Sequence, residues 1–304
     1  MIHGILPALI TPMTDDGAAV NYDTLAPLVD YLIERGCTGF FVCGGTGEGL
    51  LLTAEERRTI LEIVMAQAKG RAAVVAHIGA MATQDAQALA AHAASLGVDG
   101  VAAVPPFYFK VDRAAIAEHY RLIGEAAGDT PLWVYQIPSA TGVDITADIV
   151  PDLMAATKVS GIKYSAYNLY DMANIGTLGD INVLSGFDEV LVGALSMGAH
   201  GAIGSTYNVM PATFSRLFNA TQAGDWETAR TLQAQSNRII RALLNGPMIA
   251  GLKAILTAAG LPSGAPRRPI PPLAVDARQA YLDGVAAAGL HDLEAESLAV
   301  LKAG

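Results

Sequence analysis

The stretches "PLWVYQ" (131–136) and "KVSGIKY" (158–164) are two short apolar runs that each end in an unexpected polar residue. Runs of this length, rich in apolar and aromatic residues, predict buried strands. A buried strand usually closes in a turn of small or polar residues, yet the first run delivers Tyr135 and the second delivers Lys163. The fold must therefore explain why an aromatic hydroxyl and an amine stand at two strand ends.

Six further runs of the same kind occur along the chain, at 4–10, 38–43, 72–78, 99–104, 181–185 and 199–204. Stretches of helical periodicity separate them, for example 22–36, 53–70 and 83–97. Thr53 with Glu56 predicts a capping box, and Gly36, Gly70 and Gly97 predict helix ends. Eight evenly spaced strand-helix units predict an α/β fold, a parallel TIM (β/α)8 barrel, with a doubly wound sheet as the alternative.

The last quarter of the chain contains helical periodicity without strands, interrupted by the proline-rich stretch 261–273. We therefore predict a barrel over residues 1–222 and a C-terminal helical extension over residues 223–304, packed on the barrel. A length of 304 residues is normal for one such barrel.

Composition excludes several classes of function. The chain is 52% hydrophobic with a net charge of −10, which argues against a nucleic-acid partner. No apolar run approaches the length of a membrane span, and the N-terminus lacks a basic signal-peptide region. Cys37 and Cys43 are expected to be packing residues in a reduced setting, so we predict a cytoplasmic protein without membrane contact.

Lys163 is the lysine placed at the carboxyl end of a predicted strand, which is where active sites of such barrels lie. Side chains alternate along a strand, so Gly161 lies on the same face and would leave room for a long side chain. Burial favours the neutral form of an amine, which can attack a carbonyl to form a Schiff base. A surface or ion-paired lysine is the alternative.

Polar groups follow several other strands. The stretch "CGGTGEG" (43–49) offers backbone N–H groups and the hydroxyl of Thr46 to a small carboxylate, unless it is only a glycine-rich turn. Tyr108 follows the fourth strand and could take part in proton transfer with Tyr135. Asp188 and Glu189 follow the seventh strand.

Ser205 follows the eighth strand, and Ser165 and Gly186 complete the predicted substrate-binding set. Asp188 and Ser205 could instead be helix caps. The six histidines show no metal-ligand spacing, and His77 ends a strand without an evident partner. We therefore predict no metal and no cofactor.

Taken together, these motifs resemble the class I, pyruvate-dependent aldolases of the dihydrodipicolinate synthase and N-acetylneuraminate lyase family. The resemblance covers nearly the whole chain and is carried by "GGTGEGLLLTAEER", "YQIPSATG", "GIKYS" and "GSTYN". It implies a homotetramer in which Lys163 forms a Schiff base with pyruvate or another 2-oxo acid. Tyr135 would be the general acid/base, and Tyr108 would complete a proton relay across a subunit interface. Gly45, Thr46 and the nearby backbone would hold the pyruvate carboxylate.

The branch of the family is predicted from the residues that would meet the rest of the substrate. Synthases that use aspartate semialdehyde carry an arginine in the stretch that here contains Ala140, so a second carboxylate would lack its partner. "GFDE" and "GSTYN" resemble sialic acid lyases, which implies that Asp188, Glu189 and Ser205 bind the hydroxyls of a 2-oxo sugar acid.

Three other readings stay open on the sequence. Gly45 replaces a hydroxyl residue of the usual family motif, and "GGTGE" also resembles the 5-dehydro-4-deoxyglucarate dehydratases. A dihydrodipicolinate synthase is a further alternative within the family. A non-catalytic sugar-acid binding barrel is an alternative of another class, which the joint presence of Tyr108, Tyr135 and Lys163 disfavours.

Overall fold

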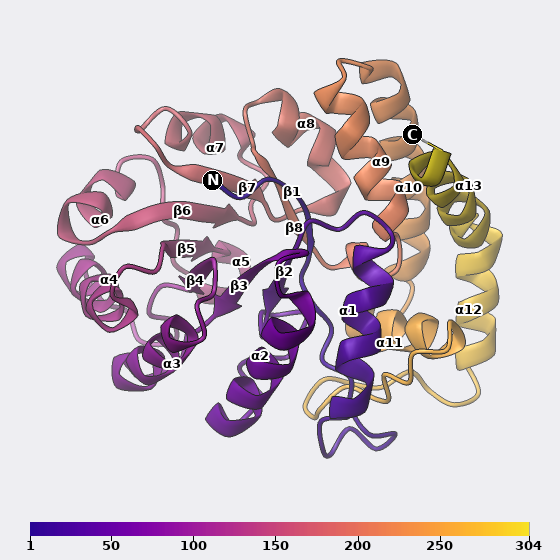
Figure 1. The fold of residues 1–304 in the computed structure, drawn as a ribbon, viewed down its shortest axis with the longest axis horizontal. Coiled ribbons are helices and arrows are strands. Elements are labelled where there is room, and N and C mark those ends of the chain that lie inside the picture. The colour runs from indigo at the N-terminus through magenta and orange to yellow at the C-terminus, as the bar shows by residue number, and fades with distance from the viewer. Residues whose placement is uncertain (304) are drawn as a thin grey trace.

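The computed structural model describes residues 1–303, and its centre is a parallel sheet of eight strands surrounded by helices (Figure 1). Every strand predicted from the sequence is present. Their bounds are β1 Gly4–Pro7, β2 Gly39–Val42, β3 Ala73–His77, β4 Gly100–Ala103, β5 Leu132–Gln136, β6 Val159–Tyr164, β7 Asn182–Ser185 and β8 Gly201–Gly204.

The sheet closes on itself. Consecutive strands pair from β2 to β8, and β8 pairs with β1. A single parallel bridge between Ala8 and Phe41 joins the first two strands. Strand β5 pairs with β6 in a register that sets Tyr135 directly beside Lys163. The prediction of a TIM barrel is confirmed, and the closed ring brings the carboxyl ends of all strands to one mouth.

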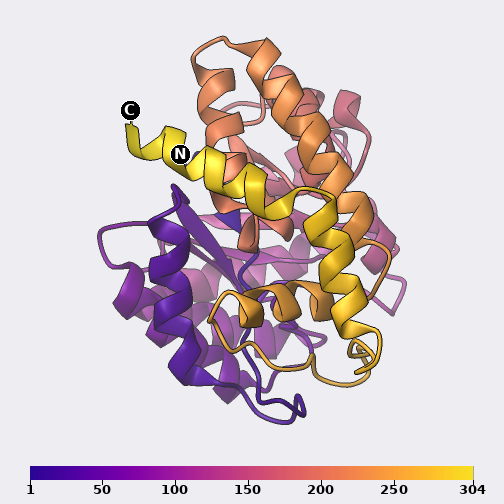
Figure 2. The ribbon, with the colours of Figure 1, turned by 90° about the vertical axis from the view of Figure 1, so that its right-hand side faces the viewer.

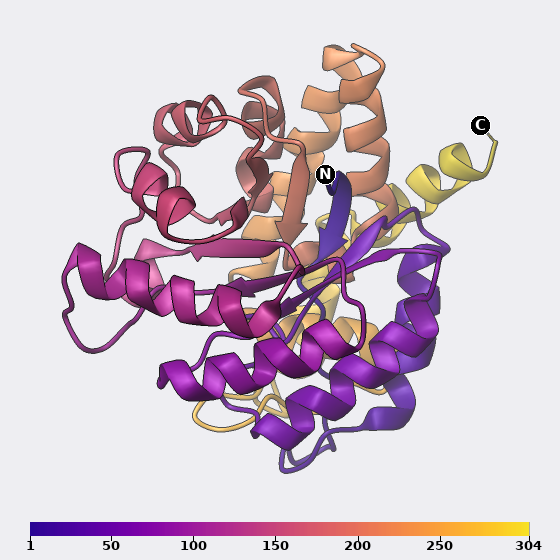
Figure 3. The ribbon, with the colours of Figure 1, turned by 60° about the vertical axis from the view of Figure 1, so that its left-hand side comes forward.

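The helices that follow the strands form the outer layer, as Figure 3 shows from the side of α1 to α4. Their bounds are η1 Tyr22–Thr24, α1 Leu25–Ile33, α2 Ala54–Ala68, α3 Thr83–Ser95, α4 Arg113–Ala127, α5 Pro138–Thr141, α6 Val150–Ala156, α7 Leu169–Ile175, η2 Asp188–Val190, α8 Leu191–Ser196, η3 Thr206–Asn208 and α9 Pro211–Gln222. The predicted capping box is confirmed, since Thr53 and Glu56 exchange both hydrogen bonds at the start of α2.

Two apolar layers hold the barrel together. The larger lies between the strands and the surrounding helices. The smaller fills the interior of the barrel and includes Phe41, Trp133, Tyr135 and Leu184. The sequence suggested that Gly161 leaves space for the Lys163 side chain. The structure shows instead that the space belongs to Trp133, because a Cβ at Gly161 would lie 2.5 Å from the Trp133 ring. The indole therefore fills the barrel at this level.

Within residues 1–303, four helices follow the barrel in sequence: α10 Trp226–Leu243, α11 Met248–Ala258, α12 Arg278–Ala287 and α13 Leu290–Ala303. Figure 2 shows them lying along one side of the barrel. The predicted boundary after residue 222 falls between α9 and α10, but the extension is in close contact with the barrel through α9. No single helix among residues 1–303 is long and apolar enough to cross a membrane.

A buried ion pair connects the extension to the loop after β2. Lys253 of α11 places its Nζ atom 2.5 Å from Oε1 of Glu48, and both side chains are fully buried. Glu48 lies in the left-handed region with φ of 59°, and its Oε2 accepts a hydrogen bond from the amide of Arg267. Burial lowers the pKa of Lys253, and the neighbouring Glu48 acts in the opposite direction. The extension thus stabilises the conformation of this loop.

This pair generates a prediction about stability. Replacement of Lys253 by Met should leave the Glu48 carboxylate buried without its cation and lower the free energy of unfolding by roughly 3–5 kcal/mol. The double variant Lys253→Met/Glu48→Gln carries no uncompensated charge and should recover much of that loss. Urea unfolding of the three proteins measures both effects. A Lys253→Met protein as stable as the parent would contradict this assignment.

Candidate active site

A pocket of about 310 Å³ opens at the mouth of the barrel, where the strands end. Its lining includes nearly all of the predicted site residues, namely Gly45, Thr46, Tyr135, Lys163, Ser165, Gly186, Asp188, Glu189 and Ser205. They come from the ends of strands β5 and β6 and from the loops after β2, β7 and β8. Helices α10 and α11 contribute Ile240, Leu244, Met248 and Ile249 to the same pocket. Closure of the barrel and packing of the C-terminal helices therefore collect residues that are far apart in the sequence, from Gly45 to Ile249.

Lys163 stands at the floor of this pocket among aromatic rings. Its side chain is buried, and Nζ lies 4.0 Å from the centroid of the Tyr135 ring and 4.3 Å from that of Phe41. Among residues 1–303, no carboxylate forms an ion pair with it, in contrast to the paired Lys253. An amine in these surroundings is exposed to the pocket yet not occupied by a counter-ion, as a nucleophile requires.

Tyr135 is held in place by its aromatic neighbours. Its ring meets Phe41 edge to face at 5.4 Å and His77 at 5.6 Å between centroids. A Cβ added at Gly45 would lie 3.8 Å from the Tyr135 hydroxyl, so this hydroxyl extends toward the loop after β2. Lys163 and Tyr135 are therefore brought together in one pocket, and both stay candidates for the chemistry.

His77 supports the site in a way that the sequence analysis did not predict. It was expected to lack a partner, but its Nδ1 lies 3.0 Å from the carbonyl oxygen of Cys43, and its ring supports Tyr135. Burial, aided by the nearby Arg57, lowers the pKa of His77 to about 3. The imidazole is therefore neutral at physiological pH, and its role is to pack against the Tyr135 ring.

The loop after β2 is built to present amides to the pocket. Cys43 has a φ of 57°, and a Cβ at Gly49 would lie 1.7 Å from the Cys43 carbonyl oxygen, so the turn requires glycine there. Among residues 1–303, the backbone amides of Gly45 and Thr46 donate no backbone hydrogen bond. Exposed successive N–H groups of this kind suit a small anion such as a carboxylate.

The hydroxyls predicted in two different loops meet each other. Thr46 Oγ1 and Ser205 Oγ lie 2.7 Å apart, so the loops after β2 and β8 are joined at the pocket. Ser205 was considered as a helix cap, but its side chain makes no capping hydrogen bond. Ser165 is buried beside Gly186, where a Cβ would lie 1.9 Å from Ser165 Oγ. Only glycine at position 186 leaves the Ser165 hydroxyl in place.

Asp188 borders the pocket but is directed largely at the loop after β8. Its Oδ2 accepts hydrogen bonds from the amide and hydroxyl of Thr206, at 2.8 and 2.7 Å. Its Oδ1 is buried without a hydrogen-bond partner among residues 1–303 and lies against Gly204, where a Cβ would be only 1.9 Å away. Burial raises the pKa of Asp188 to about 6, against the opposing effect of the Thr206 hydrogen bonds.

Glu189 is half-buried and nearer the rim of the pocket. Its Oε1 accepts a hydrogen bond of 2.6 Å from the hydroxyl of Tyr167, and its carbonyl oxygen accepts one from Asn237 of α10. Tyr167 was not among the predicted residues. No sequence signal pointed to it, because it lies two residues beyond Ser165 in an ordinary polar loop.

Tyr108 is not brought into the pocket of this chain. Its side chain is 83% exposed, with φ of 73°, and its ring contacts only the neighbouring ring of Phe109 among the aromatic pairs described. It lies in the loop after β4 with Phe109 and Val111, which are also exposed. If Tyr108 takes part in proton transfer, it must therefore do so outside the pocket of its own subunit.

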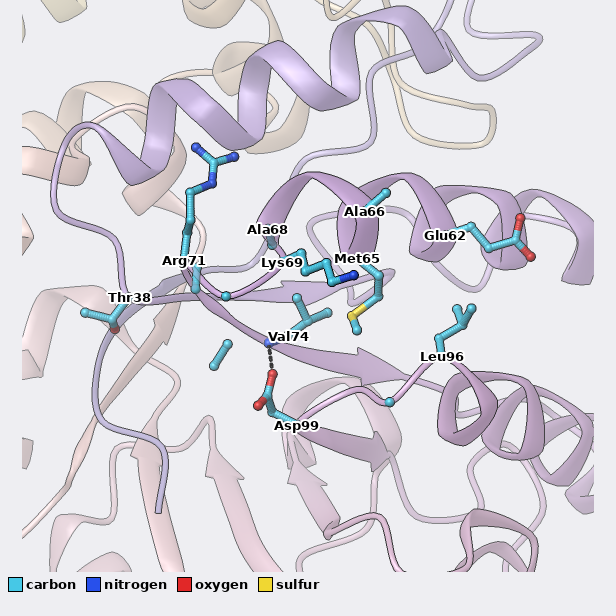
Figure 4. Close-up of a pocket in the computed structure, with 14 residues that line it drawn as sticks. Thr38, Glu62, Met65, Ala66, Ala68, Lys69, Arg71, Val74, Leu96 and Asp99 are labelled. Carbon is cyan, nitrogen blue, oxygen red and sulfur yellow. Dashed lines mark hydrogen bonds between the residues drawn. The ribbon is translucent and has the colours of Figure 1, made fainter.

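A larger hollow, of about 740 Å³, lies at the opposite end of the barrel (Figure 4). It is bordered by the C-terminal ends of α2 and α3, with Lys69 and Arg71 on one side and Asp99 on the other. Arg71 already pairs with Asp30, and Asp99 accepts a hydrogen bond from the amide of Val74. This end of a TIM barrel contributes to stability, whereas the mouth carries the chemistry.

A TIM barrel with an unpaired lysine at the end of its sixth strand, beside a tyrosine and a glycine-rich loop with free amides, has the architecture of a Schiff-base aldolase. The family model of the dihydrodipicolinate synthetase family matches residues 1–288. The chain belongs to this family, and it is a class I pyruvate-dependent lyase.

Similar proteins agree with this assignment. An N-acetylneuraminate lyase of Rhizobium meliloti (strain 1021) is 37% identical over 269 residues, covering 88% of this chain and 89% of that protein. One from Escherichia coli (strain K12 / DH10B) is 37% identical over 256 residues, covering 84% and 86%. The structure of the wild-type sialic acid aldolase of Ruminococcus gnavus superposes with a TM-score of 0.91 at 32% identity, covering 97% and 98%.

The environment of Asp188 predicts a pH dependence of stability. Its folded pKa of about 6 exceeds its ordinary value of 3.8, so the folded state binds a proton more tightly than the unfolded state does. The resulting stabilisation is present below pH about 4 and is lost as the pH rises to about 6, amounting to roughly 2–3 kcal/mol. Asp188→Asn keeps the acceptor for Thr206 and removes the titration.

Urea unfolding of both proteins at pH 4 and pH 7 measures this difference. The parent protein should gain stability relative to the variant at the lower pH. An offset between the two proteins that stays the same at both pH values would show that Asp188 does not titrate in this range.

Proposed function

We propose that this protein cleaves, and in reverse forms, a 2-oxo sugar acid, giving pyruvate and an aldehyde. The observation that carries the proposal is the unpaired, buried Lys163 amine packed against Tyr135 in a pocket that also presents free backbone amides at Gly45 and Thr46. Names of similar proteins support N-acetylneuraminate as the substrate to test first.

The proposed mechanism begins at Lys163. Its amine attacks the 2-oxo carbon, and the adduct takes up a proton and loses water to give an iminium ion. The substrate carboxylate is bound by the amides of the loop after β2, with the Thr46 hydroxyl. Tyr135 removes the proton from the hydroxyl group on the distal carbon of the bond to be broken, so that this carbon becomes the aldehyde carbonyl. The carbon–carbon bond then breaks, and its electron pair passes into the iminium ion to give an enamine.

The second half of the reaction releases pyruvate and regenerates the free enzyme. Proton transfer to the enamine carbon gives the imine of pyruvate, and water releases pyruvate while regenerating the Lys163 amine. Neither half needs a metal or a cofactor, since the iminium nitrogen accepts the electron pair. Among residues 1–303, no cluster of three or more metal-ligating side chains is present.

The identity of residues at the rim favours a neutral, hydroxylated substrate tail. Glu189, Ser165 and Ser205 offer hydrogen-bonding groups to such a tail, and the carboxylate of Asp188 also borders the pocket. The carboxylates would repel a second acidic group on the substrate. Ala140 of α5 supplies no opposing positive charge, which disfavours a synthase acting on aspartate semialdehyde.

We further infer that the active assembly is a homotetramer in the cytoplasm. The exposed aromatic loop that carries Tyr108 and Phe109 is suited to burial against a neighbouring subunit. There Tyr108 could join the proton relay of that subunit, which is the role that the resemblance implies. The buried thiols of Cys37 and Cys43 are free, as expected in a reducing compartment.

Borohydride trapping tests the chemistry. Reduction in the presence of pyruvate should add a pyruvyl mass to the peptide that contains Lys163, as mass spectrometry can show. Lys163→Arg should neither trap pyruvate nor turn over, because a guanidinium stays charged. Tyr135→Phe is the control: it should still be trapped but turn over about 10²–10⁴-fold more slowly. Labelling of another lysine in active protein would refute the mechanism.

A substrate panel tests the reaction class. Release of pyruvate should be faster from neutral-tailed acids such as N-acetylneuraminate than from dicarboxylic sugar acids. Condensation of pyruvate with aspartate semialdehyde should be slow. Efficient dehydration of a glucarate-type diacid would instead support the dehydratase alternative, to which "GGTGE" (44–48) is similar. A protein that binds sugar acids but releases nothing and traps no pyruvate would be a non-catalytic barrel.

A further inference from the structure

Tyr167 lies outside the set of residues expected from the sequence, yet it is joined to the pocket in two ways. Its hydroxyl donates a hydrogen bond of 2.6 Å to Oε1 of Glu189. Its ring packs on the ring of Phe187 with centroids 4.5 Å apart. Glu189 and Phe187 both line the pocket, whereas Tyr167 lies behind them and remains 65% exposed.

The two carboxylates after β7 lie at different depths. Asp188 is buried and lines the pocket. Its Oδ2 is already occupied by Thr206. Glu189 is half-buried and nearer the solvent, and Tyr167 engages only its Oε1. Glu189 therefore has an oxygen available for the part of a substrate that lies farthest from the amine.

The part of the pocket wall that comes from the C-terminal helices is apolar. Helices α10 and α11 line the pocket there with the apolar side chains of Ile240, Leu244, Met248 and Ile249. The Thr46 and Ser205 hydroxyls are bonded to each other. Ser165 also lines the pocket but is buried, whereas Glu189 is only half-buried. The direction of the Glu189 carboxylate therefore affects the recognition of outer hydroxyl groups.

The backbone carbonyl and the side-chain carboxylate of Glu189 each accept a hydrogen bond from a neighbouring residue. Asn237 Nδ2 donates to its carbonyl oxygen and fixes the backbone. Tyr167 alone fixes the carboxylate, since the hydrogen bonds described among residues 1–303 include no other donor to it. The pKa of Tyr167 is raised to about 12, with this hydrogen bond as its first cause, so the phenol stays a donor across the working pH range.

We propose that Tyr167 is a positioning residue that orients the Glu189 carboxylate toward the outer hydroxyls of the substrate tail, and so sets the preference for tail length. This inference rests on the proposed function, because it assumes a 2-oxo acid with a polyol tail. A substrate too short to reach Glu189 gains nothing from Tyr167, whereas a long one loses a well-placed acceptor when the phenol hydroxyl is removed.

The test compares a nine-carbon substrate, N-acetylneuraminate, with a six-carbon 2-oxo-3-deoxy sugar acid. Tyr167→Phe keeps the ring on Phe187 and removes only the hydrogen bond to Glu189. Its KM for the long substrate should rise about 3- to 10-fold, with kcat and pyruvate trapping unchanged. Its KM for the short substrate should stay at the parent value. Tyr170→Phe, at an exposed tyrosine of α7 that is not part of the pocket lining, is the matched control and should change neither.

A double-variant cycle separates positioning from a general structural role. If Tyr167 acts through Glu189, then adding Tyr167→Phe to Glu189→Ala should raise the KM for the long substrate no further. Additive effects, or an equal rise in KM for both substrates, would overturn the inference while leaving the proposed function in place. A parent protein that releases no pyruvate from either acid would overturn both.

Discussion

Parallel closure of the sheet is the constraint on which the site depends. Because β8 pairs with β1 and β1 bridges to β2, the carboxyl ends of all eight strands face one opening. The register between β5 and β6 then sets Tyr135 beside Lys163. A shift of one residue would turn these side chains out of the barrel, since alternate residues face opposite sides of a strand.

Two buried lysines in this chain illustrate how surroundings decide what a residue type does. Lys253 is neutralised by Glu48, and the pair secures the loop after β2 to the C-terminal helices. Lys163 has aromatic ring faces around its amine and no carboxylate paired with it among residues 1–303. The first lysine therefore serves the structure, while the second has the unpaired amine that the proposed Schiff-base role requires. The helical extension contributes to the site twice, through this ion pair and through the apolar wall of the pocket.

The loop after β7 carries two carboxylates, Asp188 and Glu189, which have different roles. Asp188 bonds to the amide and hydroxyl of Thr206 and so helps to shape the loop that carries Ser205. Glu189 is oriented by Tyr167 from outside the pocket. Adjacent positions in the sequence thus face different partners, because the short 3-10 turn of η2 rotates successive side chains by about 120°.

The alternation of strands and helices by itself determined the barrel, because each buried strand and each capped helix leaves a local pattern, as at Thr53 and Glu56. The same pattern located Lys163 and Tyr135 at strand ends, and the combined motifs indicated the family. Contacts between distant segments were decided only by the tertiary structure. The Trp133 indole filling the space at Gly161, the contact of His77 with Cys43, the Lys253 ion pair and the hold of Tyr167 on Glu189 depend on packing distances. Such contacts leave no periodic trace in the chain, since each joins segments that meet only when the barrel has closed.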